Sequence, residues 1–259
     1  MERKSRPGPR TEHSDDHVIE AARETLASPL FHGEGYKKVR KRLLEYKGIR
    51  VGKERLLRLM RENDLLAKER PVPNGSSRVH DGEIITEAPD RMWACDFKEW
   101  RTLEGKLWML TMLDHFDSGV IHHRTPDSPT MEPSMDLVRT SVKKRYGKVE
   151  KGICEGTGLY LRTDHASSFT GERFEKEVEF MGLEFSRAFV RSPECNGVIE
   201  RFHETIKDQI GVRIESSGKE EARSIIDKFM ADYNEHWLLH RLDLKSPNQY
   251  RQYYDRQHR

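Results

Sequence analysis

The sequence has few cysteines, no long apolar run and little net charge, and each absence excludes a class of protein. Its three cysteines, Cys95, Cys154 and Cys195, are odd in number and widely spaced, so they indicate neither a disulfide framework nor a zinc cluster. The longest apolar run, residues 107–113, is interrupted by Thr111 and is far too short to cross a bilayer. No apolar stretch follows the charged N-terminus, so no secretory signal is visible and we expect a cytoplasmic protein without a membrane partner.

The charge is unevenly distributed along the chain. The sequence has 259 residues, of which 35% are apolar and 35% charged, which suits one large or two modest folded domains. Its net charge is only +2, yet residues 1–80 carry seven more basic than acidic side chains, and residues 81–259 carry five more acidic than basic ones. This distribution indicates that the basic N-terminal segment binds phosphates. The alternative is that these basic side chains only form a solvated helical surface.

Residues 1–70 predict a helical DNA-binding segment. Apolar residues recur at helical spacing from Tyr36 to Leu44, a turn follows at Gly48, and a second helical pattern begins at Leu56. Two short basic helices around such a turn fit a helix-turn-helix, and a generic helical hairpin is the alternative. The candidate DNA-contacting residues of this segment are Lys37, Lys38, Lys41, Arg55 and Arg58.

The rest of the chain predicts a linker, an α/β domain and a helical tail. Prolines and the Asn74-Gly75 pair place the linker at residues 71–90. Strands are expected at 91–100, 107–113, 119–123, 159–163 and 183–186, with helices after the third, fourth and fifth. This order predicts a ribonuclease-H-like mixed sheet flanked by helices over residues 91–212. A polar break at 213–218 and an amphipathic helix from Ala222 to Tyr233 predict a C-terminal helical tail over residues 213–259.

Three carboxylates in different elements are the candidate catalytic residues. Asp96 lies inside an apolar strand, Asp164 ends another strand at the edge where α/β sheets place their sites, and Glu200 lies near the start of a long helix. Mg²⁺ prefers such hard oxygen ligands, and two ions can clamp the attacking and leaving oxygens of a phosphodiester. The three acids therefore predict a metal-dependent enzyme that cuts and joins DNA. In contrast, Asp114 and Asp117 lie in a strand-end turn and are interpreted as structural.

The helix around Glu200 supports this prediction, because spacing alone is weak. Acid pairs with 35 residues between them, as Asp164 and Glu200 have, also occur by chance. On a helical wheel, a buried stripe is expected to include Ile199, Phe202, Ile206 and Ile210. An adjacent band holds Asn196, Glu200, His203 and Lys207, which fits a metal site that faces a DNA phosphate. An ordinary surface glutamate is the alternative.

Several motifs together resemble the catalytic core of retroviral integrases and their bacterial relatives. These are Trp93-x-x-Asp96, the four residues ending at Asp164, and Asn196-Gly-Val-Ile-Glu200 followed by Lys207. The chain is most similar to the transposases of small insertion sequences that use two overlapping reading frames, and residues 32–63 look like their helix-turn-helix. Tyr233-Asn234 and Ser246-Pro247 match a C-terminal trait of that family, although residues 237–240 replace its usual Arg-x-His.

The resemblance implies a DNA strand-transferring transposase of the Asp-Asp-Glu type. Asp96, Asp164 and Glu200 would hold two Mg²⁺ ions, for which Mn²⁺ would substitute, and cleavage and strand transfer would proceed by in-line phosphoryl transfer without a covalent enzyme–DNA intermediate. Lys207, Asn196 and His203 would contact DNA near the scissile phosphate. The expected partners are double-stranded element ends and target DNA, further copies in a homo-oligomer, and an upstream-frame DNA-binding product, at the bacterial nucleoid.

Two other functions stay open at this point. The first is a DNA-binding regulator with an inert nuclease core, which the basic front segment favours and the intact three acids disfavour. The second is a purely hydrolytic ribonuclease-H-like nuclease, which product chemistry would distinguish from a transposase.

Overall fold

The chain divides into two compact units, one within residues 1–76 and one within residues 77–259. The structure is a computed structural model that describes residues 12–28, 30–67, 86–164, 166–187 and 197–258. Most of the predicted linker, residues 71–90, lies outside the described residues. The predicted domain boundaries therefore stay predictions, and the two units are described separately.

The N-terminal unit consists of α1 (Asp15–Leu26), α2 (Tyr36–Lys47) and α3 (Lys53–Glu62) around a small apolar core. Val39 and Leu43 of α2 are fully buried, whereas Leu44, which the pattern placed with them, is 44% exposed. The helix ends at Gly48, whose φ of 67° is left-handed and whose N–H donates to the Leu43 carbonyl. This arrangement confirms the two helices and the glycine turn predicted from the sequence.

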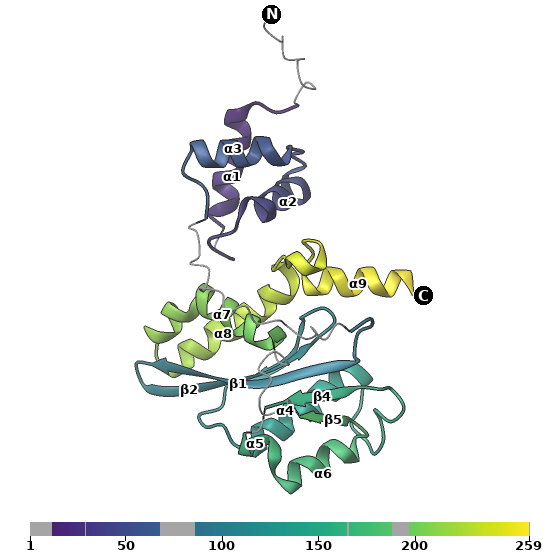
Figure 1. Cartoon of the computed structure of the whole chain (residues 1–259). Helices are drawn as coiled ribbons and strands as arrows, with labels where there is room; N and C mark the ends of the chain where they lie inside the picture. The colour runs from purple at the N-terminus through teal and green to yellow at the C-terminus, as the bar shows by residue number, and fades with distance from the viewer. Residues whose placement is uncertain (1–11, 29, 68–85, 165, 188–196, 259) are drawn as a thin grey trace, which may run out of the picture. The chain divides into compact units, whose positions relative to one another are not determined.

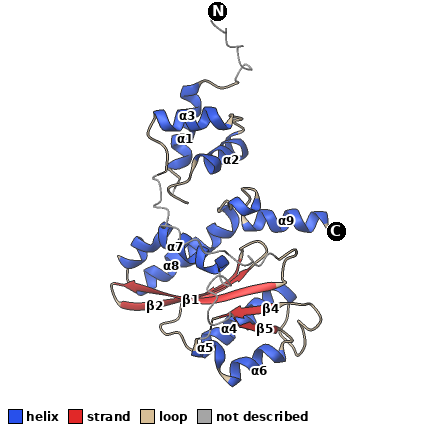
Figure 2. Ribbon diagram, viewed as in Figure 1, coloured by secondary structure: helices blue, strands red, loops and turns tan. Residues whose placement is uncertain are grey.

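The C-terminal unit is built on one mixed sheet (Figure 2). Its described strands are β1 (Met92–Thr102), β2 (Gly105–Asp114), β3 (Val120–Arg124), β4 (Tyr160–Thr163) and β5 (Glu184–Arg187), in the order β3-β2-β1-β4-β5. The first three strands pair antiparallel, and β4 joins β1 in parallel and pairs in parallel with β5. The five predicted strands and the mixed sheet are confirmed.

Helices cover both faces of this sheet (Figure 1). One face packs against α4 (Met131–Tyr146), α5 (Ser167–Thr170) and α6 (Glu172–Phe180), with Cys95 and Met112 buried in the shared core. On the other face, α7 (Gly197–Glu215) packs on β1, and α8 (Lys219–His236) packs on α7. Strand side chains alternate between faces, so the side of β1 that carries Asp96 faces away from the core containing Cys95.

The C-terminal part differs from the prediction in two places. The expected polar break at 213–218 is too long, because α7 continues to Glu215 and buries Ile214 completely. After the 3-10 turn η2 (His240–Leu242), a further helix, α9 (Pro247–Gln257), was not predicted as a separate element. Its start is fixed by a capping box, in which Ser246 and Gln249 bond each other's backbone N–H.

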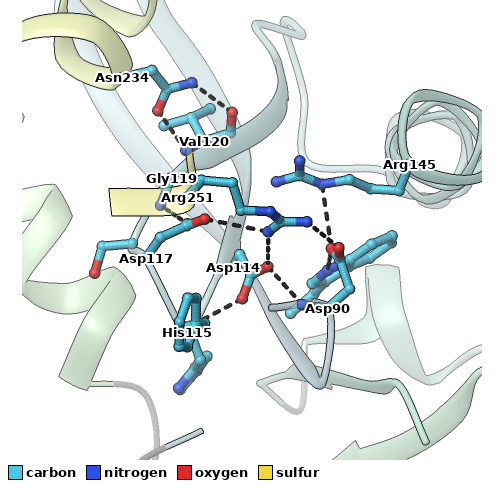
Figure 3. Close-up of polar contacts among 12 residues, drawn as sticks. Asp90, Asp114, His115, Asp117, Gly119, Val120, Arg145, Asn234 and Arg251 are labelled. Carbon is cyan, nitrogen blue, oxygen red and sulfur yellow. Dashed lines mark hydrogen bonds and ion pairs between the residues drawn. The ribbon is translucent and has the colours of Figure 1, made fainter. Parts of the chain in front are cut away.

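A side chain from α8 forms hydrogen bonds with the backbone of the edge strand β3 at Val120 (Figure 3). The Asn234 amide donates to the Val120 carbonyl and accepts from the Val120 N–H, both at 2.8 Å. One side chain thus satisfies the backbone groups that an edge strand leaves unpaired. None of the helices in the described ranges is both long and apolar enough to span a membrane.

Candidate active site

Asp96 and Asp164 lie side by side in the chain paths of neighbouring strands. The parallel register pairs Ala94 of β1 with Arg162 of β4, and each aspartate comes two residues later along the chain. Asp164 directly follows the end of β4. The sheet topology therefore brings together two of the three acids predicted from the sequence.

Asp96 has a half-buried carboxylate with contacts at both oxygens. Its Oδ1 accepts the Phe97 backbone N–H at 2.7 Å, and its Oδ2 lies 3.6 Å from Nδ1 of His203. Burial raises the pKa of Asp96 to about 7, and the negative charges of Asp164 and Glu200 add to this rise. The Phe97 N–H and the Lys98 charge partly oppose it.

The other two acids approach Asp96 from different elements. Asp164 is half-buried, and its Oδ1 accepts the Ala166 N–H at 2.9 Å, which orients the carboxylate at the start of the following turn. Glu200 is in the first turn of α7 and is exposed, although partial burial still raises its pKa above the usual value.

These acids suit a divalent cation in their chemistry. They offer hard oxygen ligands, and the charges of Asp164 and Glu200 add to the rise in the pKa of Asp96 that burial causes. Across the described ranges, however, no three His, Cys, Asp or Glu side chains are close enough together to hold one ion. The charges of Asp164 and Glu200 act on Asp96, and the joint binding of a metal by the three acids stays a prediction.

The remaining predicted residues of α7 have different environments. Ile199, Phe202, Ile206 and Ile210 form the buried stripe, as predicted. Lys207 is exposed about two turns after Glu200. His203, predicted to contact DNA, is only 7% exposed and faces Asp96. Asn196 lies outside the described residues.

The candidate DNA-contacting residues of the N-terminal unit fall into two groups. Lys37 is exposed on α2, Lys38 is half-buried, and Lys41 pairs with Glu45 at 2.8 Å. The two candidate arginines of α3, Arg55 and Arg58, bind Asp15 of α1 instead. Arg55 donates to Asp15 at 2.6 Å and to the His13 carbonyl at 2.8 Å, and Arg58 lies 3.0 Å from Asp15. These arginines therefore hold α3 against α1, and a DNA contact by them stays a prediction.

A second acidic group lies where β2 ends and the turn to β3 begins (Figure 3). Asp114 accepts the Phe116 N–H at 2.9 Å, and Asp117 accepts the Gly119 N–H at 2.7 Å. These local hydrogen bonds confirm the interpretation of both acids as structural turn residues.

No local pattern in the sequence predicts which cation neutralises this acidic group. Arg251 of α9 donates to Asp114 at 2.9 Å, to Asp117 at 3.2 Å and to Asp90. Arg145 adds an ion pair with Asp90 at 3.3 Å. Burial and the neighbouring acids Asp117 and Asp90 raise the pKa of Asp114 to about 7, and burial also raises the pKa of Asp117. This network holds α9 on the sheet and is separate from Asp96.

Comparisons with known proteins agree with the motifs. Residues 181–241, which include Glu200, match the family model of the integrase core domain. The chain is 29% identical over 204 residues to the InsD protein of insertion element IS2E from Escherichia coli, which covers 77% of this chain and 91% of that protein. It is equally similar to the transposase InsD of IS2A/D/F/H/I/K from Escherichia coli, but spans only 66% of that longer relative, slightly less than two thirds.

A solved structure shows a similar fold. A chain of the simian T-cell lymphotropic virus intasome, in complex with PP2A regulatory subunit B56 gamma, matches with a TM-score of 0.52 at 13% identity. The match covers 90% of this chain and 74% of that chain. It confirms the predicted ribonuclease-H-like architecture, a mixed sheet flanked by helices. The chain is a homologue of the InsD transposases of insertion elements and contains a region that matches the integrase core domain.

Proposed function

We propose that this protein is a DNA transposase that cleaves the ends of an insertion element and joins them to target DNA. Asp96, Asp164 and Glu200 are the proposed catalytic and metal-binding residues. The observation that carries the proposal is the placement of Asp96 on β1 beside Asp164, which directly follows the paired strand β4, in a homologue of the InsD transposases. The proposal is that acids from β1, the end of β4 and α7 act together at one place, as a transposase of this type requires.

The proposed cofactor is Mg²⁺, with two ions per site and Mn²⁺ able to substitute. When bound, such ions stabilise charge on the attacking and leaving oxygens of the phosphodiester. The protein's own part is positioning and charge neutralisation, because phosphoryl transfer needs little covalent chemistry from side chains. Asp96 must lose its proton to bind a cation, and the Ala166 N–H holds Asp164 in place for the same role.

DNA is proposed to meet the chain at two surfaces. Lys207, exposed on α7 on the same side as Glu200, is placed to contact a phosphate near the proposed site, and Asn196 is proposed to do so as well. On the N-terminal unit, the exposed Lys37 and its neighbours Lys38 and Lys41 on α2 are the proposed backbone contacts. A homo-oligomer that bridges two element ends, an upstream-frame DNA-binding partner and a location at the bacterial nucleoid complete the proposal.

The test is a strand-transfer assay on a supercoiled plasmid that carries the DNA flanking both sides of this gene. With Mg²⁺, the wild-type chain should nick the plasmid at the element ends and join them to new sites. Asp164→Asn should bind the DNA but neither cut nor join it, and Glu204→Gln, an exposed acid on α7, is the matched control. Joining by Asp164→Asn would overturn the site. Binding without cutting by the wild type would favour a regulator, and cutting without joining a hydrolytic nuclease.

A further inference from the structure

We propose that His203 is a positioning residue, whose imidazole orients Asp96 and holds the helix that carries Glu200 against strand β1. The inference rests on the proposed function, because Asp96 and Glu200 are the residues that it positions. It also replaces the direct DNA contact that the sequence predicted for His203.

The location of His203 supports this role. It follows Glu200 by three residues, so both side chains lie on one side of α7. Its Nδ1 lies 3.6 Å from Oδ2 of Asp96, while Oδ1 of Asp96 is held by the Phe97 N–H at 2.7 Å. The Phe97 N–H thus fixes Oδ1, and the imidazole of His203 is the neighbour of Oδ2. A carboxylate has about four lone-pair directions, so others stay available for a cation.

The imidazole of His203 fits a hydrogen bond to Asp96. A neutral imidazole has one N–H. Asp96 is the acceptor next to Nδ1, and in the described part of the chain the buried Nε2 has no hydrogen-bond partner. We therefore place the N–H on Nδ1. The 3.6 Å separation exceeds a formed hydrogen bond, and such contacts commonly shorten when substrate binds.

A core role alone does not account for this residue. The neighbouring stripe positions Phe202 and Ile206 are apolar and buried, and an apolar side chain would pack there without an unpaired nitrogen. An unsatisfied buried polar atom costs about 1–3 kcal/mol. A histidine that is only 7% exposed, and therefore out of reach of a DNA backbone, has its polar contact in Asp96.

The test asks whether residue 203 must carry an N–H at the position of Nδ1, or whether an N–H elsewhere on the side chain is enough. Asparagine places an amide where Nδ1 lies, whereas glutamine places it near Nε2. Calorimetric titration of the full-length protein with Mn²⁺ alone should show affinity lost about 10–100-fold in His203→Ala and His203→Gln. His203→Asn should retain the wild-type affinity, as should the neighbouring control Glu204→Gln.

Melting temperatures in EDTA provide the structural readout. If His203 only filled the core, the asparagine and glutamine variants would not differ in their affinity for Mn²⁺. Wild-type affinity in His203→Ala, or equal rescue by asparagine and glutamine, would overturn the inference while leaving the proposed function intact. Should His203→Ala fail to fold, the comparison of the two amides still decides the question. A wild-type protein that binds no Mn²⁺ would overturn the proposed metal site and this inference together.

Discussion

Replacing Arg251 by methionine should destabilise the C-terminal unit, and more strongly at high pH than at low pH. The substitution keeps a stem of similar length but removes the guanidinium that bridges Asp90, Asp114 and Asp117 (Figure 3). The Asp114 and Asp117 side chains are 0% and 3% exposed, so water cannot replace the lost cation. Removing one partner of a buried ion pair costs about 3–5 kcal/mol.

The pH dependence follows from Asp114. Its pKa is about 7 in the folded protein, above the ordinary value of 3.8. The stability that this group contributes is therefore present in full below pH 3.8 and is lost as the pH rises through about 7. Without Arg251 the pKa of Asp114 in the folded protein must rise further. The loss of stability then continues to higher pH. Each proton involved changes the free energy of unfolding by about 1.4 kcal/mol per pH unit in that range.

Urea unfolding at pH 6 and pH 8.5 measures both effects, with hydrogen exchange to locate them. Trp93 is a suitable fluorescent reporter, because its indole N–H donates to Asp90 at 3.0 Å. The amides of α9 should lose protection first. Arg256→Gln, an exposed position on the same helix, should change stability by less than about 0.5 kcal/mol. A deficit for Arg251→Met below about 1 kcal/mol at pH 8.5, or one equal at both pH values, would refute this reasoning.

Two further predictions concern the edge strand and the N-terminal unit. Asn234→Ala should lower the free energy of unfolding by about 2–3 kcal/mol in a denaturant titration, because both Val120 backbone groups lose their partner. The control is Asp232→Asn, which removes an ion pair with the exposed Lys228 on the same helix. A loss for Asn234→Ala no larger than that of the control would contradict the prediction. Arg55→Gln should lower the stability of the N-terminal unit by about 1 kcal/mol, because it loses Asp15 and the His13 carbonyl. Lys37→Gln should leave that stability unchanged and reduce the salt dependence of DNA binding by about one counterion in fluorescence anisotropy. The opposite pattern in these two variants would reverse the assigned roles.

Local patterns predicted most of the fold. Strand alternation and helical spacing are properties of neighbouring residues, so β1 to β5 and α7 are found close to their predicted bounds. The α9 helix was missed although Ser246, Pro247 and Gln249 form a recognisable helix start. The resemblance to insertion-element transposases, based on the motifs around Asp96, Asp164 and Glu200, is confirmed by the InsD relatives.

What the sequence could not show are contacts between distant segments. Arg251 meets Asp114 across 137 positions, and no local pattern pairs them. The helical wheel placed His203 beside Glu200 and Lys207, but burial depends on how α7 packs on β1, which the wheel does not contain. In the same way, Arg55 and Arg58 look like free cations in the sequence, and only the packing of α1 on α3 shows their partner Asp15.

The most direct test of the proposed site is calorimetric binding of Mn²⁺ to the full-length protein and to Asp96→Asn, Asp164→Asn and Glu200→Gln. If the three acids share the metal ions, the wild type binds Mn²⁺ and each substitution weakens or abolishes binding, while Glu204→Gln binds normally. Wild-type affinity in any of the three variants would show that this acid holds no metal, and the account of the active site would fail.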